Sequence, residues 1–232
     1  MPERVATLSI RRLVIVPAVI TFAVTLLRLV GELQRWSPRF FSREAGGAGA
    51  IIGIVWLVPI FGIYFAFRLN QAGRGPAGRG RAIGFPLAGL AVGVVFTFVI
   101  IKLSLPIVAT IVLANLAMLL PLWIAYRGWP ELGRVEAIYG LAARIPVAVL
   151  MLIAMAANWG THYEQGPPGF PQMSLLSKWF LIGLMPQLSL WIAFTVTVGS
   201  LFGGLALLFQ KRQQVSEAVS QGPPARGLGA HP

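Results

Sequence analysis

Residues 82–126 read AIGFPLAGLAVGVVFTFVIIKLSLPIVATIVLANLAMLLPLWIAY. This stretch contains a single charged side chain, Lys102. A helix that crosses a bilayer needs about 20 apolar residues. The stretch is too long for one such helix, and Lys102 and Pro106 mark a turn inside it. It therefore predicts two membrane-spanning helices, 82–101 and 104–126, joined by a short connection.

The rest of the chain continues this pattern. The sequence is 56% hydrophobic and only 11% charged, whereas a soluble domain carries about 25% charged residues. We expect an all-α integral membrane protein with one domain, 1–209, followed by a disordered cytoplasmic tail, 210–232, that is polar and rich in Gly and Pro. Four further apolar runs are long enough to span a bilayer: 13–31, 49–67, 138–157 and 180–209. With 82–101 and 104–126 they make a bundle of six transmembrane helices.

Lysine and arginine predict the orientation of the bundle. Twelve of them fall on the side that holds both termini and the loops 68–81 and 127–136, and five fall on the other side. The positive-inside rule then places both termini in the cytoplasm. The basic side would meet anionic lipid rather than nucleic acid, because the loop 68–81 lacks aromatic residues. An excess of arginine over lysine, with abundant Ala and Gly, fits a GC-rich bacterium and hence a bacterial inner membrane.

Several kinds of chemistry lack their residues. The chain has no cysteine, which excludes disulfides, thiolate metal sites and cysteine nucleophiles. Its seven acidic residues are all Glu, so aspartyl chemistry is excluded. No Glu falls in the middle of a predicted span, which counts against a carboxylate-coupled transporter.

Two arginines lie within predicted spans. Arg28 is near the outer end of the first helix, and Arg144 is in the first two turns of the helix 138–157. Intramembrane arginine is costly and often functional, but a long side chain can also reach the nearest headgroups. A functional Arg144 would hold a lipid phosphate or the carboxylate of a partner.

Small residues form two GxxxG-type motifs. Gly89 and Gly93 form one in the third predicted helix, and a second lies in the last helix at Gly199, Gly203 and Gly204. Such motifs let helix backbones approach closely. They could serve the fold, a homo-oligomer or a larger membrane complex.

The two long outer segments, 32–49 and 158–178, are the richest in chemistry. The second contains NWGTHYEQGPPGFPQ, residues 158–172, which includes His162. Folded together, these segments would gather Arg28, Glu32, Arg35, Arg39, Arg43, Glu44, His162, Tyr163 and Glu164. One histidine is a poor start for a zinc site, so we expect neither a metal nor a cofactor. Gly-Pro-Pro-Gly and the interfacial aromatic residues also fit a rigid external loop without a site.

Two functions remain open. The first is a non-enzymatic membrane component: a small facilitator, a lipid-handling protein or an accessory subunit. The second is a membrane enzyme that acts on a lipid or isoprenoid headgroup at the outer face. In the enzyme, His162 and Glu164 would transfer protons, and Arg28, Arg39 and Arg43 would hold the anion.

Overall fold

The structure is a computed structural model that describes residues 9–47 and 50–209. These residues form helices and contain no strand. The predicted tail, 210–232, lies outside the described residues. Five helical segments are long and apolar enough to cross a membrane: Ile10–Leu33, Arg79–Lys102, Ile107–Gly128, Pro130–Ala157 and Leu175–Ala206. The all-helical class is confirmed for the described residues, and these segments are compatible with a multi-pass membrane protein.

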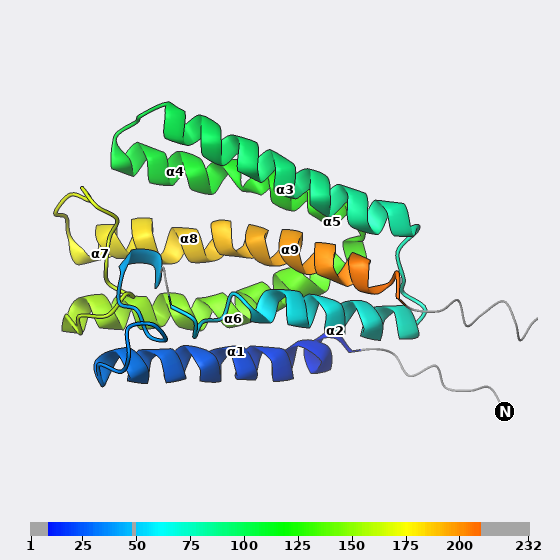
Figure 1. The fold of residues 1–232 in the computed structure, drawn as a ribbon, viewed down its shortest axis with the longest axis horizontal. Helices are drawn as coiled ribbons and strands as arrows, with labels where there is room; N and C mark the ends of the chain where they lie inside the picture. The colour runs from blue at the N-terminus through cyan, green and yellow to red at the C-terminus, as the bar shows by residue number, and fades with distance from the viewer. Residues whose placement is uncertain (1–8, 48–49, 210–232) are drawn as a thin grey trace, which may run out of the picture.

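The helices run side by side along the long axis of the molecule (Figure 1). Helix α1 lies against α6, and α9 lies between α6 and the hairpin that α3 makes with α4 and α5. Helices α4 and α5 are separated only at Met118 and together form one long segment, Ile107–Gly128. Helix α3 ends at Lys102 and α4 begins directly after Pro106, so the chain turns where the sequence predicts it. The bounds are Ile10–Leu33 for α1, Arg79–Lys102 for α3, Ile107–Ala117 for α4, Leu119–Gly128 for α5, Pro130–Ala157 for α6 and Leu190–Ala206 for α9.

The second predicted span, 49–67, differs from the structure. Helix α2 covers Leu57–Gln71 and is only 15 residues long. Residues 50–56 precede it without a regular helix, after a single 3-10 turn, η1 (Ala45–Gly47). In Figure 1, α2 fills only half the length of the bundle, and the loop that follows α1 fills the other half. Hydropathy measures only the apolar content of a segment, which does not distinguish helical from irregular backbone. The prediction from hydropathy therefore placed the start of the second helix too early.

The fifth predicted span, 138–157, also begins too late. Helix α6 starts at Pro130 and contains 28 residues. Proline suits the first position of a helix because its missing N–H needs no partner there, and Glu131 in the first turn favours the same start. The charged residues of 127–136 suggested a loop. Because α6 includes these charged residues, Arg144 lies further from the start of its helix than predicted, and Glu136 belongs to a helix long enough to span a membrane.

The last membrane segment is interrupted rather than continuous. It begins with α7 (Leu175–Lys178), widens into a π-helical turn, η2 (Trp179–Leu184), and continues as α8 (Met185–Leu188). Ser189 then departs from ideal helix geometry, with φ −115° and ψ −74°, before α9 begins. Pro186 contributes to this break because it lacks the N–H that a continuous helix requires.

The small-residue motifs are used within the chain. A Cβ at Gly89 would lie 2.8 Å from the carbonyl oxygen of Pro121 in α5. A Cβ at Gly62 of α2 would meet the backbone of Gly199 in α9, and a Cβ at Gly203 would lie 2.9 Å from the Gly62 carbonyl oxygen. These glycines therefore pack helices of the same chain, and the fold accounts for both motifs.

Candidate functional site

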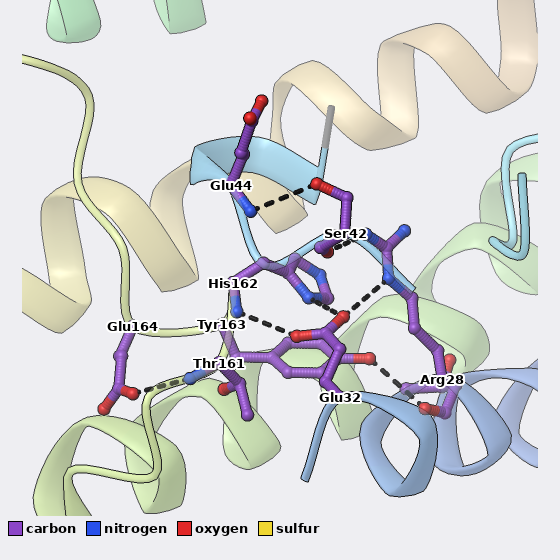
Figure 2. Close-up of polar contacts among 9 residues, drawn as sticks. Arg28, Glu32, Ser42, Glu44, Thr161, His162, Tyr163 and Glu164 are labelled. Atoms are coloured by element: carbon purple, nitrogen blue, oxygen red, sulfur yellow. Dashed lines mark hydrogen bonds and ion pairs between the residues drawn. The ribbon is translucent and has the colours of Figure 1, made fainter. Parts of the chain in front are cut away.

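The two loops at one end of the bundle meet around a buried carboxylate. We call residues 34–47, 50–56 and 158–174 the cap. Glu32, at the end of α1, is 1% exposed. Its Oε1 accepts a hydrogen bond from Arg28 Nε at 2.9 Å and contacts His162 Nδ1 at 2.5 Å, while its Oε2 accepts from the His162 backbone N–H at 2.9 Å. Figure 2 shows Glu32 between the arginine and the histidine, so it joins α1 to the second loop.

The protonation of His162 follows from this geometry. Burial lowers the pKa of His162, and the charge of Arg28 lowers it further, whereas the bond to Glu32 acts in the opposite direction. The lowered pKa favours a neutral ring at neutral pH. A carboxylate can only accept a hydrogen bond, so Nδ1 carries the proton and Nε2 is left with its lone pair. The adjacent Tyr163 is also held in place, since its hydroxyl donates to the carbonyl oxygen of Thr25 at 3.2 Å.

A cavity of about 240 Å³ extends from the cap into the bundle. Its volume is below the range of about 300–1,000 Å³ for pockets that hold drug-sized ligands. It suits a small anion or one headgroup. The polar side chains on its wall come from four parts of the chain, namely α1, α6, the second cap loop and the interrupted last helix: Thr25, Arg28, Arg144, His162, Tyr163, Gln165 and Gln187.

Arg144 is the deepest charge in this cavity. It lies 14 residues after Pro130, the first residue of the 28-residue α6, which is about 21 Å along the axis at ~1.5 Å per residue. It is therefore near the middle of the helix rather than in its first two turns, and with 4% exposure it does not reach a headgroup. Its Nη1 donates to Gln187 Oε1 at 3.4 Å, and its Cζ lies 4.5 Å from the centre of the Trp191 ring.

No carboxylate balances Arg144 within the described residues. The ion pairs found there join Arg28 to Glu32 and Arg74 to Glu131, and neutral His162 contributes a hydrogen bond to Glu32. A long amide contact and a ring face stabilise a guanidinium less than a carboxylate does. The cavity therefore carries one positive charge for which the described residues supply no counter-charge.

The cavity lies beside two irregular parts of the helical bundle. Residues 53–56, which precede α2, line one side, and Ile182, Pro186 and Gln187 of the broken last segment line another. Helix α2 begins beside the cavity, directly after Trp56. No side chain caps its first turn, so the partial positive charge of this helix end is not compensated by a side chain. In transporters, interrupted helices at the middle of the membrane provide ion and substrate sites in this way.

Other predicted site residues lie elsewhere. Arg39 and Arg43 are exposed and do not line the cavity. Glu164 turns away from His162, because its Oε1 accepts the backbone N–H of Thr161 at 2.8 Å (Figure 2). It holds the loop rather than facing the cavity. The described residues contain no group of three His, Asp or Glu side chains that could hold a metal ion.

Several buried polar residues were missed or given only a packing role. Thr25, Gln187 and Trp191 carried no functional prediction. A signal for Thr25 was present: Thr21, Thr25, Arg28 and Glu32 recur at helical spacing and form one polar face of α1. Glu136 was missed because the helix containing it was expected to begin two residues later.

Comparison of the chain with protein-family models, with curated proteins and with solved structures found no match.

Proposed function

We propose that this chain is a non-enzymatic protein of a bacterial cytoplasmic membrane that binds an anionic group in the cavity beneath its cap. It crosses the membrane six times with both termini inside, and residues 50–56 together with α2 make the second crossing. The bound group is a phosphate or a carboxylate. It belongs either to a membrane lipid or to a small solute, so the protein is a lipid-handling protein or a small facilitator.

The observation that carries this proposal is Arg144. A charge at this depth is rare unless it pairs with another group or marks a binding site. Its contacts with Gln187 and Trp191 position the guanidinium but leave its charge uncompensated. An anion in the cavity would supply the missing charge and make short, charge-assisted hydrogen bonds.

The alternative role of accessory subunit has less support. The glycine faces that would fit a foreign helix are occupied by helices of the same chain. The cavity, in contrast, is lined by residues from several parts of this chain.

The test is anion-dependent stabilisation of the purified protein in neutral detergent. We would add phosphatidylglycerol, phosphatidylcholine or inorganic phosphate separately, and follow thermal unfolding by tryptophan fluorescence. A ligand that binds only the folded state stabilises it by about 2.7 kcal/mol at a hundredfold excess over its dissociation constant. Stabilisation by phosphatidylglycerol alone indicates a lipid headgroup, and stabilisation by inorganic phosphate as well indicates a solute.

The variant Arg144→Gln should weaken anion binding roughly tenfold to hundredfold, from the loss of about 1.5–3 kcal/mol for a hydrogen bond to a charged group. Arg127→Gln is the matched control, because Arg127 also lies over a tryptophan ring, with its Cζ 5.1 Å from the centre of Trp123, but is exposed. Equal anion responses in both variants and the wild type would contradict the proposal.

The enzyme hypothesis keeps one specific observation in its favour. His162 faces the cavity, and its Nδ1 is held by Glu32 at 2.5 Å, an arrangement that orients an imidazole for proton transfer. Glu32 would then replace Glu164 as its carboxylate partner. Incubation with an isoprenoid phosphate, with products followed by mass spectrometry, tests this alternative: turnover that His162→Ala abolishes in a folded protein supports the enzyme.

A further inference from the structure

A second buried carboxyl group lies away from the cavity, toward the opposite end of α6. Glu136 is 1% exposed and belongs to the second turn of that helix. Its Oε2 accepts a hydrogen bond from Ser200 Oγ of α9 at 2.6 Å. Its Oε1 has no hydrogen-bond partner among the described residues. A buried acceptor without a partner is uncommon in native structures and calls for an explanation.

The surroundings of Glu136 are closely packed. A Cβ at Gly199 would lie 2.5 Å from Oε1, and Gly199 in turn packs against the backbone of Gly62 in α2. Leu132 of α6 and Ala66 of α2 face Gly203 at the next level of the same contact. Helices α2, α6 and α9 therefore enclose the carboxyl group with backbone and apolar atoms.

No cation faces this carboxyl group within the described residues. On the helices packed around it, Arg68 of α2, Arg79 and Arg81 of α3 and Arg134 of α6 are exposed. The buried cation of α6, Arg144, contacts Gln187 and Trp191 instead. Tyr139 lies three residues after Glu136 on α6, and its hydroxyl is engaged with Thr21 Oγ1 at 2.7 Å. An ionised carboxylate in this place would have one hydroxyl donor and no counter-charge, which is costly in an apolar interior.

From this geometry we propose that Glu136 is a proton-binding site, which holds one proton while α2, α6 and α9 are packed together. Binding the proton removes the charge and leaves a carboxylic acid that keeps the hydrogen bond from Ser200. Release of the proton requires α2 or α9 to move aside, so that water or a cation can reach the carboxylate. This inference does not depend on the anion cavity.

Helix α2 connects Glu136 with the cavity, and a link between the two sites rests on the anion binding proposed above. The cavity is bordered by the residues that precede α2, and α2 also covers Glu136 through Gly62. One helix therefore contacts both places. A movement of α2 that opens the cavity would also expose the carboxyl group, which is how proton release could be linked to passage of the anion.

The test is infrared spectroscopy of the full chain in lipid at neutral pH. A protonated carboxylic acid gives a carbonyl stretching band separate from the amide and carboxylate bands. The wild type should show this band, Glu136→Gln should lose it, and Glu32→Gln should keep it because Glu32 is paired with Arg28. Ser200→Ala should shift the band without abolishing it, since the hydrogen bond to Oε2 is lost.

The outcomes decide the matter even if Glu136→Gln does not fold. The wild-type band and its shift in Ser200→Ala are then sufficient to support the assignment. Absence of the band in the wild type, persistence of the band in a folded Glu136→Gln variant, or an unshifted band in Ser200→Ala would each overturn it.

Discussion

The contact between α2 and α9 gives the sharpest prediction about stability. Gly62 of α2 faces Gly199 of α9, and a Cβ at position 62 would lie 2.6 Å from Gly199 Cα and 2.7 Å from its carbonyl carbon. These are backbone atoms inside a helix, so they cannot move as a flexible side chain would. The substitution Gly62→Ala must therefore push the two helices apart.

The magnitude follows from two opposing terms. Overpacking a close contact costs about 1–3 kcal/mol, and replacing glycine by alanine inside a helix gains about 1 kcal/mol. Gly84→Ala is the matched control because Gly84 lies in α3, is exposed, and has open space where the Cβ would go. The helix term is common to both variants, so Gly62→Ala should be less stable than Gly84→Ala by about 1–3 kcal/mol.

The assay is equilibrium unfolding in mixtures of neutral detergent and dodecyl sulfate, followed by far-ultraviolet circular dichroism. Gly62→Ala should unfold at a lower dodecyl sulfate fraction than the wild type, and Gly84→Ala at the same fraction or a higher one. Gly62→Ala as stable as Gly84→Ala would refute the direct backbone contact between α2 and α9, and with it the enclosure of Glu136.

Two further predictions use the same assay. Lowering the pH below about 6.5 should destabilise the wild type more than His162→Gln. The pKa of His162 is lowered in the folded protein, so the unfolded chain binds the proton at a higher pH than the folded protein does. The stability that His162 contributes is therefore complete above this pH and falls below it. Parallel loss in both proteins would argue against the buried, neutral ring. A double-mutant cycle of Thr21→Val and Tyr139→Phe should give a coupling free energy of about 0.6 kcal/mol, typical of hydrogen bonds between membrane helices. Strictly additive effects would mean that the 2.7 Å contact between the two hydroxyls contributes nothing to stability.

The sequence predicts the structure correctly where the length of an apolar run alone decides it. The hairpin around Lys102 and Pro106 forms as predicted, because two apolar runs of spanning length cannot share one helix in a bilayer. It failed where a helix boundary depends on local chemistry. Pro130 starts α6 amid charged residues, and residues 50–56 before α2 stay irregular although their hydropathy matches that of a helix.

The candidate site was anticipated only in part. The structure brings Arg28, Glu32, His162 and Tyr163 together beneath the cap, but it leaves Arg39 outside. Proximity in sequence suggested that Glu164 would be the partner of His162. Glu32, 130 positions away, takes that place, and no single-sequence pattern reveals such a pairing.

The sequence by itself determined the membrane class of this protein, because backbone groups in a bilayer must bond within helices and only long apolar runs can supply them. It also determined the residue types available for chemistry. Only the tertiary structure decided that Arg144 lies in a cavity to which the described residues contribute no carboxylate, and that Glu136 lies against Ser200. The environment of a buried charge is set by side chains from other helices, and their position depends on how the helices pack.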